Sequence, residues 1–221
     1  MISFAALVSR DLHIATRAGG SVLLAISFFA ATTALFPLGI GINPSFLFRM
    51  AAGVVWVAAV FACLLSLDRL FEADYEDGSL DLLALGPLSL EGVALAKIVS
   101  HWLTSGLPLT LVSPLLALLF RLPQAASVAL AISLLVGTPA VSAIGAIGAA
   151  LTISVRRGGL ILPLIVLPLL TPVVIFGTGA VLATLDGMSN GALPLLAAFS
   201  LASVLLAPFA TAAALRLHLA A

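Results

Sequence analysis

Residues 51–67 read AAGVVWVAAVFACLLSL, an almost continuously apolar stretch without a charged side chain. An α-helix rises about 1.5 Å per residue, so roughly 20 apolar residues are needed to cross the ~30 Å hydrocarbon core of a membrane. A strand of a membrane β-barrel would instead alternate apolar and polar residues over about ten positions. The stretch therefore predicts a helix that spans a membrane and argues against a barrel strand.

The remainder of the chain has the same apolar character. Of its 221 residues, 62% are hydrophobic and 8% are charged, against roughly 45 to 50% and 25% in soluble domains. Comparable runs predict spans at residues 21–42, 50–67, 98–120, 127–155, 160–184 and 192–215. We expect an all-α integral membrane protein of about six transmembrane helices, folded as a single permease domain over residues 1–221.

The distribution of basic residues predicts the orientation of these spans, because Lys and Arg are enriched in the cytoplasmic loops of membrane proteins. With the N-terminus inside, only Arg49 and Arg121 face outward. The cytoplasmic segments then hold the other seven of the nine basic residues, namely Arg10, Arg17, Arg69, Lys97, Arg156, Arg157 and Arg216. We therefore expect both termini to be cytoplasmic.

Residues 1–20 precede the first predicted span and have an amphipathic pattern. One helical face would carry Phe4, Val8, Leu12 and Ala15, and another would carry Ser9, Arg10, His13, Thr16 and Arg17. This pattern predicts a helix that lies in the membrane interface. A disordered basic leader is the alternative.

Residues 68–97 form the largest polar segment, a predicted cytoplasmic loop. Its charged residues are Asp68, Arg69, Glu72, Asp74, Glu76, Asp77, Asp81, Glu91 and Lys97. After Gly78, a short predicted helix contains Leu80, Leu82, Leu83 and Leu85 and ends at Gly86 and Pro87. Closely spaced leucines are unfavourable in water without a partner or a membrane surface. The loop therefore predicts a docking helix, with a solvated acidic connector as the alternative.

Several function classes are disfavoured by what the sequence lacks. No Asp, Glu, Lys or Arg lies inside the predicted spans, which argues against an ion-coupled carrier. No GxxxxGKS or GxxxxGKT phosphate loop occurs, so any energy from ATP would come through a partner chain. The three histidines are scattered and Cys63 is the only cysteine, so we expect no catalytic residue, no metal site and no enzymatic activity. The balanced charge gives no sign of nucleic-acid binding.

The loop also has a recognisable pattern, EDGSLDLLALGPLS at residues 76–89. It resembles the segment before the third span of ABC-2-type permeases. In those proteins the segment is the coupling element that contacts an ATPase subunit. By this resemblance, the coupling residues here are Glu72, Glu76, Asp77, Gly78, Asp81, Leu82, Leu83 and Pro87.

Further motifs follow in order along nearly the whole chain: LFPL at 35–38, VVWVAA at 54–59, AK at 96–97, HW at 101–102, GLPL at 106–109, GTP at 137–139, RRGG at 156–159 and APFATAAALR at 207–216. This succession resembles the haem exporter protein B family (CcmB). The resemblance implies a homodimeric permease of the bacterial inner membrane with six spans. It also implies a CcmA-like ATPase, CcmC-like and CcmD-like haem-handling subunits, and indirectly a CcmE-like haem chaperone.

Haem is then the expected transported ligand, with no covalently bound cofactor and with ATP bound only by the partner. His101 is the candidate haem ligand of this chain, because a neutral imidazole can coordinate haem iron. The alternative is a polar interfacial side chain that is hydrogen-bonded to a neighbour.

We therefore predict the permease subunit of an ABC haem-export complex in cytochrome c biogenesis, driven through residues 68–97. Two alternatives remain. The first is a scaffold that assembles haem-handling proteins without transport, which the charge-free spans would allow. The second is a standalone transporter, which the lack of intramembrane ionisable residues disfavours.

Overall fold

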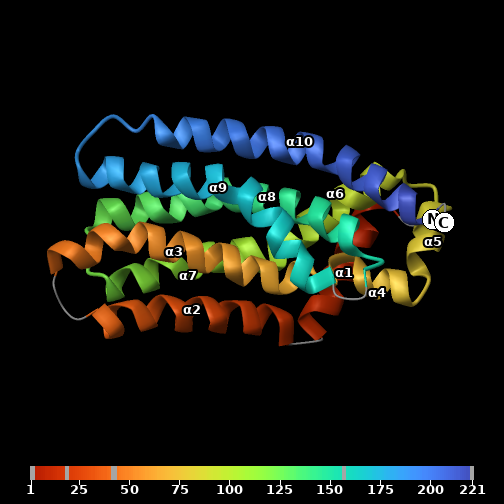
Figure 1. The fold of residues 1–221 in the computed structure, drawn as a ribbon, viewed down its shortest axis with the longest axis horizontal. Helices are drawn as coiled ribbons and strands as arrows, with labels where there is room; N and C mark the ends of the chain where they lie inside the picture. The colour runs from red at the N-terminus through yellow and green to blue at the C-terminus, as the bar shows by residue number, and fades with distance from the viewer. Residues whose placement is uncertain (1–2, 18–19, 41–43, 156–157, 220–221) are drawn as a thin grey trace.

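The computed structural model describes residues 3–17, 20–40, 44–155 and 158–219, and these form an elongated helical bundle (Figure 1). The helices are α1 (Phe4–Arg17), α2 (Gly20–Ile40), α3 (Pro44–Leu67), α4 (Arg69–Glu76), α5 (Ser79–Ala84), α6 (Leu90–His101), the π-helical η1 (Trp102–Gly106), α7 (Leu107–Leu119), α8 (Gln124–Thr152), α9 (Gly158–Leu185) and α10 (Ala192–Leu219). No strand occurs in these described ranges.

Within the described ranges, six helical segments are long and apolar enough to cross a membrane: Val22–Gly39, Leu47–Glu76, Leu90–Leu119, Gln124–Thr152, Ile161–Leu185 and Ala192–His218. The prediction of an all-α membrane protein with six spans is confirmed. The predicted orientation stays a prediction. Two of its basic residues, Arg156 and Arg157, and the side chain of Arg17 lie outside the described residues.

The third spanning helix begins earlier in the chain than predicted. It runs without interruption over Leu90–Leu119 through α6, η1 and α7, so Lys97 lies within it and not in the loop before it. Ser89 explains the early start, because its side chain accepts a hydrogen bond from the Gly92 N–H at 3.2 Å. Such a cap satisfies a donor that a new helix would otherwise leave free.

Helix α3 also begins early, at Pro44, which places Arg49 inside a spanning helix. The predicted spans themselves contain no Asp, Glu, Lys or Arg, but the observed helices extend beyond those bounds and include charged residues near their ends, Arg49 and Lys97 among them. Both cations are paired with carboxylates. Arg49 Nη2 lies 2.8 Å from Asp186 Oδ1 at one end of the bundle, and Lys97 contacts two aspartates at the other.

Helix α1 confirms that the leader is helical, so the alternative of a disordered leader is wrong. Its packed face includes Val8 of the predicted apolar face and adds Leu7. Leu7 is fully buried and packs with Leu83, Val93 and Ala96, whereas Phe4 is exposed. The third spanning helix supplies this apolar surface, and contact with it decides which side of α1 faces inward.

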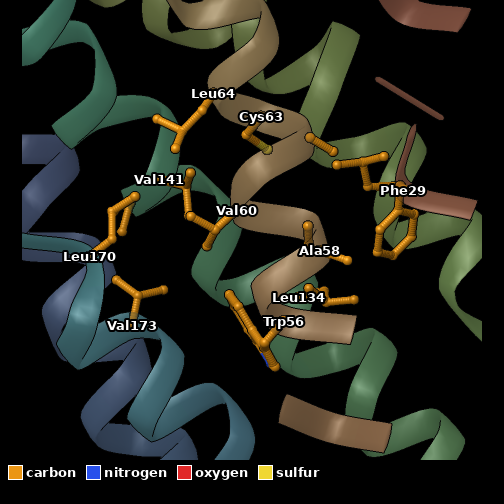
Figure 2. Packing of buried hydrophobic residues seen from close by; sticks show 14 of the residues in the cluster. Phe29, Trp56, Ala58, Val60, Cys63, Leu64, Leu134, Val141, Leu170 and Val173 are labelled. Carbon is orange, nitrogen blue, oxygen red and sulfur yellow. The ribbon is translucent and has the colours of Figure 1, made fainter. Parts of the chain in front are cut away.

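Trp56 of α3 anchors the interior of the bundle, as Figure 2 shows. Its indole is fully buried, and its Nε1–H donates to Ser133 Oγ of α8 at 3.1 Å. The ring packs against the backbone at Gly137 of α8 and Gly177 of α9, where an added Cβ would overlap ring atoms. Helix α8 also contacts α6, α7 and α10. Small residues therefore let three helices approach one large side chain.

Replacing Gly177 by Ala is expected to destabilise the protein by about 1 to 3 kcal/mol, because overpacking a filled interior forces side chains off their rotamers. Thermal unfolding in detergent measures the loss. Gly53→Ala is the matched control, since no atom lies within 4 Å of its added Cβ. Ala is favoured over Gly in helices, so the control is expected to be neutral or slightly stabilising. Equal losses in the two variants would contradict the packing role.

Candidate functional site

The helices of the predicted coupling loop lie at one end of the bundle, together with α1 and the end of α10 (Figure 1). Helix α4 ends at a turn in which Gly78 has φ +74°, a conformation that favours glycine. Asp77 holds this turn, because Ser79 donates to Asp77 Oδ1 from its N–H at 2.8 Å and from its Oγ at 2.5 Å. These bonds hold the pKa of the Asp77 carboxyl below its ordinary value. These hydrogen bonds therefore hold the turn between α4 and α5 in a defined conformation.

The outer surface of α4 and α5 combines exposed apolar and acidic side chains. We call this surface the acidic cap: Tyr75, Leu82 and Leu85 with Glu72, Glu76, Asp77 and Asp81, all of which are exposed. Leu82 is 71% and Leu85 86% exposed. Four exposed carboxylates and two exposed leucines therefore lie within fourteen consecutive residues, with both leucines after Asp81.

The predicted coupling residues do not all face outward. Pro87 is exposed beside the acidic cap, and Gly78 is half-buried in the turn. Leu83 is buried against Leu7 of α1 and Val93 of α6. Leu83 therefore holds α5 against the bundle, whereas its neighbour Leu82 is available for contact.

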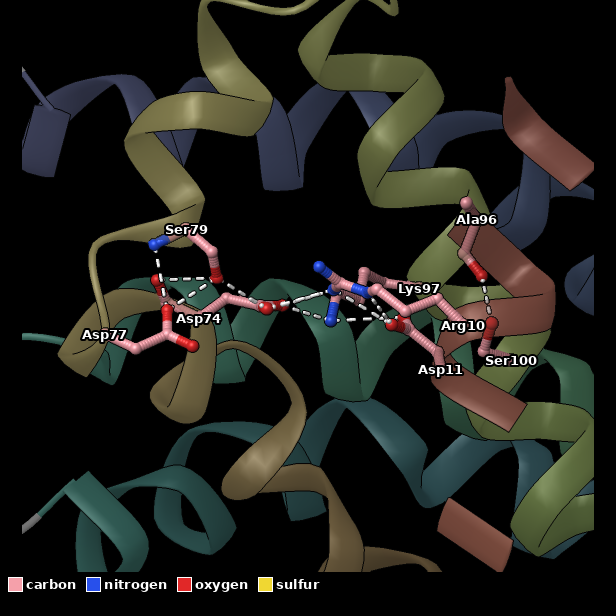
Figure 3. A network of polar contacts seen from close by, with 8 residues as sticks. All are labelled: Arg10, Asp11, Asp74, Asp77, Ser79, Ala96, Lys97 and Ser100. Carbon is pink, nitrogen blue, oxygen red and sulfur yellow. Dashed lines mark hydrogen bonds and ion pairs between the residues drawn. The ribbon is translucent and has the colours of Figure 1, made fainter. Parts of the chain in front are cut away.

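Behind the acidic cap lies a cluster of four charged residues, which we call the charge cluster: Arg10, Asp11, Asp74 and Lys97 (Figure 3). Arg10 Nη2 lies 2.9 Å from both Asp11 Oδ1 and Asp74 Oδ1. Lys97 Nζ lies 3.1 Å from Asp11 Oδ2 and also contacts Asp74 Oδ2. The cluster thereby joins α1, α4 and α6, three segments that are distant in sequence.

The ion pairs of the charge cluster matter for stability because they are buried. The side chains of Lys97 and Asp74 are only 7% and 10% exposed. Burial by itself lowers the pKa of Arg10, but the carboxylates of Asp74 and Asp11 outweigh this effect and keep that pKa above its ordinary value. Sequence reasoning missed the cluster. The available signal was Lys97, the chain's only lysine, in an otherwise apolar stretch before the third span.

His101 lies deeper in the bundle and is buried. Its Nδ1 is 2.8 Å from Ser142 Oγ and its Nε2 is 3.0 Å from Ser66 Oγ. Haem coordination by His101 would require one of these bonds to be exchanged, and it stays a prediction. No group of three His, Cys, Asp or Glu side chains converges on a metal position within the described ranges.

Replacing Lys97 by Met is expected to destabilise the protein by about 3 to 5 kcal/mol, because it leaves two buried aspartates with one cation. Adding Asp74→Asn is expected to recover much of the loss. Thermal unfolding in detergent measures both changes.

Arg216→Met is the control, since the Arg216–Glu91 pair is more exposed. Such surface pairs contribute about 0 to 1 kcal/mol. A loss as large as that of Lys97→Met, or no recovery in the double variant, would argue against the charge cluster as a stabilising unit.

Comparison with known proteins gives full-length matches. The sequence profile described as CcmB protein matches residues 2–218. Heme exporter protein B of Paracoccus denitrificans is 54% identical over 217 residues, or 97% of this chain and 99% of the relative. The Rhodobacter capsulatus protein of the same name is 50% identical over 215 residues, with 97% and 99% covered. That of Escherichia coli K12 is 43% identical over 210 residues, with 95% and 96% covered. The chain therefore belongs to the CcmB protein family, as the sequence motifs predicted.

Proposed function

We propose that this chain is the permease subunit of a haem-export system that serves cytochrome c maturation. Its six spanning helices and its full-length similarity to proteins named heme exporter protein B support this function. The chain is a multi-pass protein of the bacterial inner membrane. Its own role is not enzymatic, and ATP is hydrolysed by a separate, CcmA-like subunit.

The acidic cap is the single observation that best supports an ATPase partner. Leu82 and Leu85 are large apolar side chains that are almost fully exposed beyond the spanning helices. Exposed apolar side chains ringed by polar ones are typical of a surface that another protein covers. The surrounding carboxylates favour a partner surface that carries basic residues. Two copies of the ATPase would dock on the two caps of a homodimer.

Two connections within the chain support coupling between the acidic cap and the spanning helices. Helix α4 follows α3 after Asp68 alone, so a displacement of α4 acts directly on the second span. Asp74 of α4 also binds Arg10 of α1 and Lys97 of the third span. Binding and hydrolysis of ATP by an ATPase docked on the acidic cap would therefore shift several helices together.

The same proposal assigns the other partners. CcmC-like and CcmD-like subunits handle haem in the membrane, and a CcmE-like chaperone receives it. Haem is the cargo of the complex. In this arrangement the present chain contributes motion that an ATPase drives, and it holds no cofactor of its own.

Replacing Leu82 and Leu85 together by Ser is expected to reduce the ATPase recovered with the tagged chain severalfold and to lower cytochrome c maturation. Removal of contact area at the acidic cap is the cause, since neither leucine supports the fold. Co-purification in mild detergent and haem staining of c-type cytochromes measure the two effects.

Leu217→Ser is the matched control, because Leu217 is 70% exposed on α10 at the same end of the bundle. It is expected to change neither quantity. Full ATPase recovery in the double variant would show that the ATPase does not dock on the acidic cap.

A second experiment separates the permease from a scaffold. The wild-type chain is expressed with a partner ATPase that binds ATP but cannot hydrolyse it. The permease function predicts that the complex assembles and that maturation stops, since no motion is driven. A scaffold predicts that maturation continues once the complex has formed. Haem staining together with co-purification distinguishes the two.

A further inference from the structure

A cavity of about 570 Å³ lies beside the charge cluster, between α1, α2, α3, α4 and α6. One part of its wall is polar and includes the four residues of the charge cluster and Arg69. Another part is apolar and includes Ile14, Leu24 and Leu65. All three of these apolar side chains are exposed. The cavity thus offers a charged wall and an apolar wall to one occupant.

The charges of the polar wall favour an anion. Within the charge cluster, two cations balance two carboxylates. Arg69 adds a third cation, and its guanidinium makes no hydrogen bond or ion pair with any residue in the described part of the chain. Arg10 uses Nε and Nη2 for its carboxylate partners, so its Nη1 has no bond to a described residue. Two guanidinium groups therefore have donors to offer.

The hydroxyl groups of the wall do not change this preference. Ser66 Oγ donates to the Cys63 carbonyl of its own helix at 3.1 Å. Ser100 Oγ donates to the Ala96 carbonyl at 2.8 Å, and Thr104 Oγ1 donates to the Ser100 carbonyl at 2.9 Å. Their protons are thus engaged within their own helices. Guanidinium donors are suited to phosphate, which they bind through charge-assisted hydrogen bonds.

The position of the cavity favours an occupant that comes from the membrane. Arg69 lies two residues after Leu67, where α3 ends, and α2 begins at Gly20. The polar wall therefore lies at the level where two spanning helices leave the hydrocarbon. Leu24 lies four residues into α2 and Leu65 four residues before Arg69, and both are exposed. A phospholipid has its phosphate at the first level and its acyl chains at the second.

We propose that this cavity binds an anionic phospholipid, with its phosphate on Arg69 and Arg10 and its acyl chain against Leu24 and Leu65. The bound lipid joins α1 to the ends of α2 and α3. It supplies the negative charge that Arg69 lacks among the described residues. Lipid binding at this site does not depend on the proposed ATPase partner, so either idea can fail alone.

Native mass spectrometry of the purified full-length chain in mild detergent tests the proposal. Dioleoyl phosphatidylglycerol is titrated against dioleoyl phosphatidylcholine, which has the same chains and no net charge. The wild-type chain is expected to retain phosphatidylglycerol preferentially. Arg69→Ala is expected to weaken that binding about fivefold, the effect typical of one basic residue at an anionic membrane, without changing phosphatidylcholine retention.

Two further variants keep the test decisive. Arg49→Ala removes an exposed arginine at the opposite end of the bundle and is expected to leave lipid retention unchanged. Ala73→Phe places a ring in the cavity while Arg69 is kept, and it is expected to abolish the preference. Ala73 is exposed, so this change does not disturb the interior.

Three results would overturn the proposal. The first is equal retention of the two lipids by the wild-type chain. The second is equal weakening by Arg69→Ala and Arg49→Ala. The third is thermal stabilisation by inorganic phosphate that matches phosphatidylglycerol and is lost in Arg69→Ala, which would show a site for soluble anions and not for lipid.

Discussion

The pairing of Lys97 with Asp74 and Asp11 is the contact on which the end of this bundle depends. A buried ammonium group is strongly unfavourable unless carboxylates compensate it. Lys97 can therefore occupy a spanning helix only while α1 and α4 deliver their aspartates to it. The same contact holds the leader helix in place and fixes the helix that carries the acidic cap. The need to compensate the charge of Lys97 thus holds together three helices that are distant in sequence.

The middle of the bundle follows a different rule. Lipid is as apolar as a leucine side chain, so helices within a membrane gain little from burying apolar groups and depend on close packing. Glycines on α8 and α9 provide that closeness around Trp56, and Ser133 satisfies the indole N–H. Polar contacts at the end and close packing in the middle are complementary, because a rigid interior can pass on a displacement that begins at the acidic cap.

The apolar runs were sufficient to predict six spans, since length and composition alone determine what can cross a bilayer. Charge spacing did not reveal the charge cluster, because residues 10, 11, 74 and 97 meet only after three segments have packed. Leu82 and Leu83 are identical neighbours, so the sequence could not show which of them is buried. Leu83 is buried because it packs against Leu7 and Val93. His101 was predicted at the start of the third span, as a haem ligand or as an interfacial polar side chain. The early start of its helix at Leu90 places it beside Ser142 of α8 instead.

Lys97 has a practical consequence as the chain's only lysine. Amine-directed reagents and proteases that cleave after lysine have one lysine target in this chain, and it is shielded while the charge cluster is closed. The rate of modification at this single position is therefore an intrinsic gauge of how often α1, α4 and α6 separate. It allows the opening of this end to be followed without a prior amino-acid substitution to introduce a labelling site.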